Sequence, residues 1–418
     1  MPSSPIITLG GCAPIAAVFH WDLCIKSLLT PLASLPQDHA QATLVGRIWV
    51  PGRGPVLVRA HADRLDDLSG LAMTMSDLLD LPQPAQAVRQ HAAPRLADTA
   101  AVLANSLPDD RQPATPWLLA PCDLQALKAA GVTFVASMLE RVIEEQARGD
   151  ASRAESVRKA VVAIIGDNLS LVKPGSPQAA QLKQVLLDQG MWSQYLEVGI
   201  GPDAEIFTKS QPMSAVGSGA EVGIHPGSEW NNPEPEIVLA VNSRGETVGA
   251  TLGNDVNLRD FEGRSALLLG KAKDNNGSCA IGPFIRLFDE HFGIQNVRQC
   301  DLTMKVTGPE GYVLEGASSL SKISRDPLDL VSQAIGPNHQ YPDGLMLFLG
   351  TMFAPTQDRP MPGKPAGQGF THRVGDVVAV TTPTLGTLVN RVQTSDRVAP
   401  WTYGVRALLQ DLARQQKA

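Results

Sequence analysis

The chain has 418 residues, which is long enough for a large hydrophobic core and for more than one domain. Hydrophobic residues make up 43% and charged residues 18%, a composition that excludes an intrinsically disordered chain. The formal net charge is -7 and no basic stripe with interleaved aromatic residues occurs, so the composition argues against a nucleic-acid partner.

The N-terminal forty residues contain a nearly uncharged run from Ile6 to Phe19. This run lacks the positively charged segment that precedes the apolar core of a signal peptide, and His20 and Asp22 close it. It is also shorter than the roughly 18 to 20 apolar residues that span a bilayer. We therefore expect no membrane association, and residues 1–40 are interpreted as a floppy, disordered or mis-assigned N-terminal extension, with a cleaved signal peptide as the lesser alternative.

The cysteines point to a reducing compartment. They are odd in number, widely scattered and without a CxxC pair: Cys12, Cys24, Cys122, Cys279 and Cys300. Neither a zinc site nor a disulfide framework is indicated, and a cytoplasmic protein is the expectation.

Residues 43–59 predict a β-hairpin, because two apolar, β-branched runs flank the turn Pro51–Gly54. From Leu81 to Pro116 the chain is rich in Ala, Pro and Asp with weak periodicity, which is typical of a connecting region. We place a domain boundary there. The prediction is a small β-containing N-terminal domain over 41–115 and a catalytic domain over 116–418.

Helical periodicity dominates the first part of the predicted catalytic domain and β-strand patterns dominate the rest. Helices are predicted over 123–131, 132–150, 151–165 and 176–189, the last with Ser176 as its cap and Gly190 as its stop. After Gly199 the chain predicts strands, interrupted by one short helix at 264–273; their sequences are EIVLAV, TVGATLG, LTMKVTG, GLMLFLG, DVVAVTT and LGTLVNRV. The expected fold class is α+β and β-rich.

Two carboxylates open the strand EIVLAV. Residues i and i+2 of a strand share a face, so Glu234 and Glu236 project together, while Pro235 turns away. Two buried carboxylates repel each other unless a cation lies between them, and oxygen-only ligands favour Mg²⁺, Mn²⁺ or Ca²⁺ over zinc. Asp255, at the end of the next predicted strand, can return as a third ligand. The alternative is that all three are solvated edge and turn residues.

Several motifs in this region resemble the fumarylacetoacetate hydrolase superfamily over roughly residues 117–405: PEPEIVLAV, GNDVNLRDFEGRS, KAKDNN, IGPF and FLGTMFAP. The resemblance implies a mixed β-roll catalytic domain, a homodimer or higher homo-oligomer, and Mg²⁺, with Mn²⁺ as a substitute, bound to a 2-oxoacid substrate. It assigns the metal ligands to Glu234, Glu236 and Asp255. It also implies a catalytic Lys273 and substrate contacts from Arg259 and Thr351.

Hydrolases of this superfamily carry a lid motif in which a histidine and a glutamate activate water. The matching segment here places Ser137 at the histidine position and Glu140 at the glutamate position, which makes Ser137 a candidate substrate contact and Glu140 a candidate catalytic residue. Serine is a poor base near neutral pH, so the substitution argues against C–C bond hydrolysis.

Further motifs resemble a dehydratase branch of the superfamily that acts on 2-keto-3-deoxy sugar acids: DLQALKAAGVTF, LERVIEEQARGD, WSQYLEVGIGPDAEIFTK, WNNPEPE and HQYPDGLMLFLGTMFAP. This resemblance implies dehydration of 2-keto-3-deoxy-D-pentonate to 2,5-dioxopentanoate. It assigns proton transfer to Glu205, with Lys209 on the same strand face as a substrate contact. The division of acid and base roles between Glu205 and Lys273 stays open.

Each assignment has a structural alternative. Glu140 is equally a solvated helix residue beside Arg141 and Glu144, Lys209 a surface lysine, and Arg259 a partner of Asp260 or Glu262. Ser137 is equally a packing residue, and Cys279 reads as a buried small apolar residue. Two competing functions also stay open: a hydrolase of acylpyruvates or 2,4-diketo acids, and a non-catalytic sugar-acid binding protein.

Overall fold

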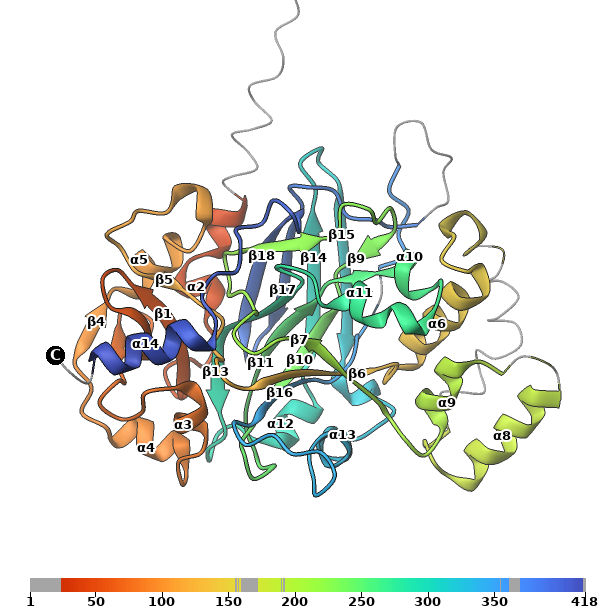
Figure 1. Ribbon diagram of the computed structural model, residues 1–418, viewed down its shortest axis with the longest axis horizontal. Helices are drawn as coiled ribbons and strands as arrows, with labels where there is room; N and C mark the ends of the chain where they lie inside the picture. The colour runs from red at the N-terminus through yellow and green to blue at the C-terminus, as the bar shows by residue number, and fades with distance from the viewer. Residues whose placement is uncertain are drawn as a thin grey trace, which may run out of the picture.

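The computed structural model describes residues 24–415, except 155, 157, 159–171, 189, 191, 354 and 361–368. Two large sheets form the centre of the molecule, and helices lie at both ends of it (Figure 1). The observed α+β, sheet-rich architecture confirms the predicted fold class. Among the described residues, none of the helices combines the length and the apolar character that crossing a lipid bilayer would require.

The first sheet has eleven strands and carries the candidate site. In spatial order it contains β4 (Arg95–Ala97), β3 (Leu65–Asp67), β2 (Gly54–Ala60), β1 (Leu44–Val50), β13 (Cys279–Leu287), β11 (Thr247–Asp255), β10 (Pro235–Val241), β16 (Leu345–Phe348), β6 (Ala126–Gly131) and β7 (Glu205–Ser210), with β5 (Trp117–Leu118) paired to β1. Most neighbours are antiparallel, whereas β16 and β6 run parallel.

The second sheet covers one face of the first. It contains β15 (Val313–Ser319), β14 (Asp301–Thr307), β17 (Val377–Thr382), β18 (Gly386–Thr394) and β8 (Glu221–Ile224). A short ribbon pairs β9 (Asn231–Asn232) with β12 (Asn257–Leu258) next to the candidate site.

The helices are short, and most of them cap the ends of the sheets. They are α2 (Pro31–Ser34), α3 (Met75–Leu79), α4 (Pro84–Gln90), α5 (Thr99–Ala104), α6 (Val135–Ala147), α8 (Pro177–Asp188), α9 (Gln194–Ile200), α10 (Arg259–Glu262), α11 (Leu269–Lys273), α12 (Ile294–Arg298), α13 (Pro327–Ala334) and α14 (Val405–Gln415), with 3₁₀ turns η1 (Pro108–Asp110), η2 (Ala266–Leu268) and η3 (Leu320–Lys322). In Figure 1 helices α6, α8 and α9 lie at one end of the molecule and α3, α4 and α5 at the other.

Strand β10 is buried on both faces, which explains its unbroken apolar sequence. Ile237, Leu239 and Val241 pack into the core that the two sheets share. Val238 and Ala240 point the other way, into a core that includes residues of α3 and α4. Charged residues at the start of such a strand are therefore enclosed by protein, and this sets the electrostatics of the site.

The predicted hairpin over 43–59 is confirmed by the antiparallel pairing of β1 and β2. The helix predicted over 176–189 is confirmed as α8, where the hydroxyl of Ser176 accepts a hydrogen bond from Ala179 N at 3.2 Å. The helix over 132–150 is confirmed as α6. The prediction over 151–165 falls largely on residues outside the described part of the chain.

The helix predicted over 123–131 is wrong, because Ala126–Gly131 form strand β6. Leucine, lysine and alanine favour helix, but the segment is inserted between β16 and β7 and hydrogen-bonds to both. Sheet pairing and the burial of Leu127 and Ala129 outweigh a propensity of a few tenths of a kcal/mol per residue.

The segment 81–116, interpreted as a connecting region, holds α4, β4, α5 and η1. These elements are too short to show a periodicity in the sequence, yet Val88 and Leu103 are fully buried. The first sheet also runs continuously from β1 to β13, so residues on both sides of the predicted domain boundary share it. The division into domains stays a prediction.

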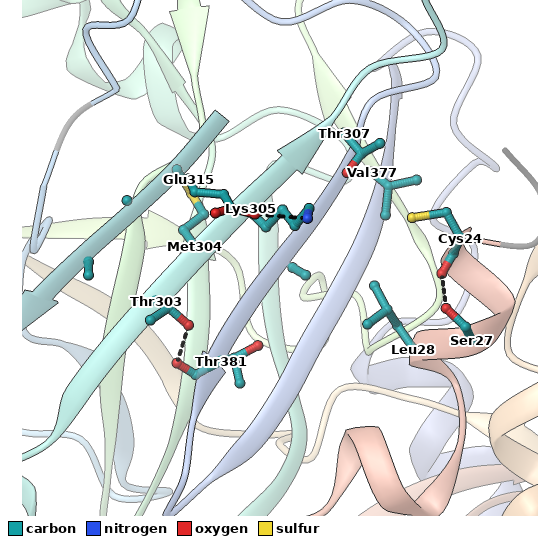
Figure 2. Close-up of a pocket in the computed structure, with 13 residues that line it drawn as sticks. Cys24, Ser27, Leu28, Thr303, Met304, Lys305, Thr307, Glu315, Val377 and Thr381 are labelled. Atoms are coloured by element: carbon teal, nitrogen blue, oxygen red, sulfur yellow. Dashed lines mark hydrogen bonds and ion pairs between the residues drawn. The ribbon is translucent and has the colours of Figure 1, made fainter. Parts of the chain in front are cut away.

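A cavity of about 700 Å³ lies between the N-terminal segment and the outer face of the second sheet. Figure 2 shows Cys24 and Leu28 on one side, with Thr303, Lys305 and Thr381 on the strands opposite. Lys305 is already paired with Glu315 at 2.8 Å. None of the predicted site residues lines this cavity, so the predicted active site lies elsewhere in the fold.

Candidate active site

The pairing of β10 with β11 brings three carboxylates together. Pro235 lies opposite Asn254, and the backbone N–H of Asp255 donates to the carbonyl oxygen of Glu234 at 3.0 Å. Glu236 follows two residues later on the same face. One carboxylate oxygen from each of Glu234, Glu236 and Asp255 lies within 4.8 Å of the others, and all three residues are buried. This spacing suits three ligands of one cation.

Two lysines, both buried, flank this cluster. Lys273, at the end of α11, donates from Nζ to Glu234 Oε2 at 2.6 Å and to Asp255 Oδ2 at 3.1 Å. Lys209 on β7 donates to the carbonyl of Lys273 at 2.6 Å, and its Nζ lies 3.1 Å from Asp255 Oδ1. Lys209 is therefore not a surface lysine. It holds Asp255 and the backbone of Lys273 in place.

The pKa of Lys273 is raised. Burial alone would lower it, but the adjacent Asp255, Glu234 and Glu262 outweigh burial. These neighbours favour the charged form of the lysine.

Arg141 on α6 is a site residue that the sequence did not identify. Its guanidinium contacts Glu234, and it also lies 2.7 Å from Glu144 and 2.9 Å from Glu262. Burial opposes ionisation of Glu234, but Arg141 and Lys273 overcome this effect and lower its pKa to about 2. Glu234 is thus held as a carboxylate, ready to act as a ligand.

The pKa values of Glu262 and Glu236 are raised rather than lowered. Burial raises the pKa of Glu262 to about 7 in spite of Arg141, because three carboxylates share one guanidinium. Burial and the neighbouring Asp255 and Glu234 also raise the pKa of Glu236, although Gly350 N donates to its Oε2 at 2.7 Å. Without a cation the cluster is rich in negative charge.

Arg259 lies in the same network and is almost fully buried. Its Nε donates to Asn232 Oδ1 at 2.7 Å and lies 3.3 Å from Glu144 Oε1, and its Nη2 donates to the carbonyl of Pro355 at 3.2 Å. Its carboxylate partner is Glu144 on α6 rather than Asp260 or Glu262. The guanidinium fixes α6 against the segment that follows β12.

Two predicted residues of α6 take different positions. Ser137 is buried on this helix. Glu140 forms an ion pair with Arg158 and makes no contact with the three carboxylates in the described part of the chain. Residues 141 and 144 present charge to the cluster, and their spacing of three residues puts both on one face of the helix.

Glu205 begins β7 directly opposite Gly131 of β6 and is half-buried. Burial, together with Glu234 and Asp255, raises the pKa of its carboxyl above the usual value, against the opposing charges of Arg141 and Lys273. A Cβ at position 131 would lie 1.9 Å from Glu205 Oε2, so the absence of a side chain there makes room for the carboxyl. A carboxyl with a raised pKa suits proton transfer near neutral pH.

Thr351 is buried beside the cluster, and its hydroxyl donates to Glu236 Oε1 at 3.5 Å. Gly350, with φ of 103°, makes the turn that aims its own N–H and the Thr351 hydroxyl at the same carboxylate. Cys279 is buried, and burial raises the pKa of its thiol, which fits an unreactive apolar residue.

One buried histidine lies next to this region. His372 donates its backbone N–H to Asn231 Oδ1 at 3.2 Å, and its Nδ1 lies 3.1 Å from Asp376 Oδ2. Its Nε2 has no hydrogen-bond partner among the described residues. Sequence spacing could not indicate it, because His372 lies more than a hundred residues from the carboxylate motifs.

A profile described as fumarylacetoacetate (FAA) hydrolase C-terminal matches residues 188–393. A 2-dehydro-3-deoxy-D-arabinonate dehydratase of Saccharolobus solfataricus is 32% identical over 189 residues, covering 45% of this chain and 58% of the relative. A probable 2-keto-3-deoxyxylonate dehydratase of Haloferax volcanii is 30% identical over 207 residues, covering 50% and 66%. The matched segments thus span less than two thirds of either relative.

Solved structures agree on the fold. A 2-keto-3-deoxy-D-arabinonate dehydratase complexed with magnesium and 2,5-dioxopentanoate superposes with a TM-score of 0.57 at 23% identity, covering 84% of this chain and 99% of that one. A fumarylacetoacetate hydrolase from Exiguobacterium antarcticum superposes with a TM-score of 0.50 at 15% identity, covering 84% and 100%. At these identities the likeness concerns architecture alone.

Proposed function

We propose that the chain, which carries a fumarylacetoacetate hydrolase family domain at residues 188–393, is a Mg²⁺-dependent sugar-acid dehydratase of that family. The proposed reaction converts 2-keto-3-deoxy-D-pentonate into 2,5-dioxopentanoate and water. The observation that carries the proposal is the buried cluster of Glu234, Glu236 and Asp255, with Lys273 on its edge. Both curated relatives are named as dehydratases of this substrate class.

The residues present fit a hard divalent cation. The three carboxylates are buried, and Asp255 Oδ1 has no hydrogen-bond partner among the described residues, only the ion pair with Lys209. Three buried carboxylates this close together repel one another, and a divalent cation between them would remove that cost. When bound there, Mg²⁺ or Mn²⁺ would supply Lewis-acid polarisation of the 2-oxo and carboxylate oxygens, which acidifies the C3 protons.

We assign the proton transfers to Glu205. Lys273 donates to Glu234 and Asp255, and we assign it the binding of developing negative charge. The carboxylate of Glu205 takes a proton from C3 and then delivers it to the C4 hydroxyl, which leaves as water. The double bond then shifts toward C5 with loss of a C5 proton and gain of one at C3, and the resulting enol ketonises to the aldehyde. Lys209, Arg141 and Arg259 position the carboxylates, and Thr351 orients Glu236.

The hydrolase alternative receives less support. Its catalytic pair would lie on α6, where serine occupies the histidine position and Glu140 is engaged by Arg158. A binding protein without catalysis would have no use for a carboxyl of raised pKa beside the cluster.

The test is a coupled assay with purified protein and 2-keto-3-deoxy-D-pentonate. We expect 2,5-dioxopentanoate to form with Mg²⁺, and EDTA or Glu234→Gln to abolish its formation. The 2,5-dioxopentanoate formed is oxidised by an added semialdehyde dehydrogenase, and the reduction of its nicotinamide cofactor is measured. Release of pyruvate from an acylpyruvate at a comparable rate, or activity that survives both EDTA and Glu234→Gln, would contradict the proposal.

We propose further that the protein acts in the cytoplasm as a homodimer or higher homo-oligomer, without nucleic-acid or membrane partners. The support is the family resemblance, the acidic net charge of -7 and the absence of a membrane-spanning helix among the described residues. Sedimentation velocity of the full chain tests the oligomeric state.

A further inference from the structure

A second cavity, of about 210 Å³, lies apart from the carboxylate cluster. Four aromatic side chains wall it: Trp49 on β1, Trp117 on β5, and Trp401 and Tyr403 in the segment before α14. Three of the six tryptophans of the chain gather here, although only 5% of its residues are aromatic. Such a concentration makes a flat-faced, apolar wall.

The rings are arranged as a corner. Trp49 and Trp117 are nearly parallel, with an interplanar angle of 21° and centroids 5.9 Å apart. Tyr403 meets Trp49 edge-on, at 5.1 Å and 89°. Trp401 is held by a hydrogen bond from its Nε1 to the carbonyl of Tyr403 at 2.9 Å, and yet 47% of its surface is exposed. The wall is fixed by the fold and open on one side.

Arg111 adds a positive charge to the lining of the cavity. Its guanidinium lies 4.5 Å from the ring centroid of Trp117 and donates to the carbonyl of Ser106 at 3.1 Å. In the part of the chain that the structure describes, it has no carboxylate partner, since the adjacent Asp109 and Asp110 pair with Arg391 and Lys26 instead. Burial also lowers the pKa of this guanidinium, the sign of a desolvated charge. A half-buried cation beside a hydrophobic wall favours an anion.

The size of the cavity limits the ligand. Drug-sized ligands occupy roughly 300 to 1,000 Å³, so 210 Å³ admits little more than one ring. The flat wall selects a planar face. Arg111 donates from Nε to the carbonyl of Asn105 and from Nη2 to that of Ser106, so the edge formed by its two Nη groups is the one that can meet a carboxylate.

We propose that this aromatic cavity is a second binding site, which takes a small planar carboxylate with its ring against the half-exposed Trp401 of the aromatic wall and its carboxylate on Arg111. The site does not depend on the proposed dehydratase reaction, because none of the residues assigned to that reaction lines it. It does adjoin the catalytic segments. Met213 lies three residues beyond the end of β7, which carries Glu205 and Lys209, and Asn276 lies three residues beyond Lys273.

The test uses benzoate as the probe and the full chain as the protein. Quenching of tryptophan fluorescence and isothermal calorimetry should both report saturable binding with one site per chain. Arg111→Gln should raise the Kd at least tenfold, since it removes the charge and keeps the stacked side chain. Arg95→Gln, at an exposed arginine away from the cavity, should leave the Kd unchanged.

Three comparisons make the result decisive. Trp401→Ala, at an exposed position, should weaken benzoate binding without lowering the melting temperature, which covers the case that Arg111→Gln misfolds. Cyclohexanecarboxylate, which has the same charge but no flat face, should bind several-fold more weakly than benzoate. Glu234→Gln and EDTA should leave benzoate binding intact. The proposal is overturned by an absence of saturable binding, by equal affinity of wild type and Arg111→Gln, or by loss of binding in Glu234→Gln, which would place benzoate in the metal site.

Discussion

Glu205 is the residue on which the proposed chemistry depends most directly, because it is the carboxyl of raised pKa at the margin of the carboxylate cluster. Glu205→Gln keeps its size and removes its proton-accepting oxygen. We expect kcat to fall by about 10² to 10⁴, the usual contribution of general acid–base assistance, while KM changes little. Steady-state kinetics in the coupled assay measure this split. A large rise in KM with unchanged kcat would instead identify Glu205 as a binding residue.

Glu262 should make the stability of the metal-free protein depend on pH. Its pKa rises on folding from the ordinary 4.5 to about 7. The folded state therefore binds a proton that the unfolded state releases, and this contribution is complete below about pH 4.5 and is lost as the pH rises through about 7. In EDTA, the free energy of unfolding of the wild type should fall between pH 5 and pH 8 more steeply than that of Glu262→Gln. Urea unfolding measures both, and parallel curves would refute the assignment.

The candidate ligands could be predicted from the sequence, whereas the residues that tune them could not. Glu234 and Glu236 share a face by strand geometry alone, and one turn returns Asp255 to them. Arg141 could not be predicted in this way. A charged residue in an amphipathic helix is usually solvated, and only the packing of α6 against the sheet buries it between three carboxylates.

At the scale of elements, the pairing of β6 with β7 positions the catalytic carboxyl. Gly131→Ala would place a Cβ 1.9 Å from Glu205 Oε2, and the side chain of Glu205 would have to move because it is the more flexible partner. We expect a fall in kcat of about 10- to 100-fold, since a displacement near 1 Å can cost this much. Steady-state kinetics and thermal melting measure the effect, which should leave the melting temperature nearly unchanged.

The matched control is Gly336→Ala, where the nearest heavy atom to the added Cβ is 4.0 Å away. It should alter neither kcat nor the melting temperature. Equal activity of Gly131→Ala and wild type would contradict the prediction, because it would mean that the position of the Glu205 carboxyl does not limit catalysis.

Strands that follow alternation or continuous apolar runs were predictable, and β6 was not. Its sequence, ALKAAG, favours a helix, and nothing local indicates the parallel partner β16, which lies more than two hundred residues away. A contact of such sequence separation is decided by the assembled sheet rather than by the segment. The same holds for α4 and α5, whose few turns are stabilised by burial of residues such as Val88 and Leu103.

At the scale of the whole molecule, the N-terminal part is built into the catalytic sheet. β1 pairs with β13, and Leu78 and Val88 pack against the back of β10. A fragment of residues 116–418 would expose this surface and the edge of β13. We expect it to lose the cooperative thermal transition of the full chain and to bind an apolar dye, as measured by calorimetry and fluorescence. A fragment that melts cooperatively and keeps its activity would support the predicted boundary as that of an autonomous domain.

The buried charges around the cluster have a consequence for the order in which ligands bind. Five buried carboxylates (Glu144, Glu234, Glu236, Asp255 and Glu262) face four buried cations (Arg141, Lys209, Arg259 and Lys273). A divalent cation would add two positive charges to this cluster, and the carboxylate of a 2-oxo acid bound beside it would offset one of them. Each ligand should therefore raise the affinity for the other by the same factor. Calorimetric titration of Mg²⁺ with and without pyruvate should show a lower Kd in its presence, and an unchanged Kd would mean that the two bind independently.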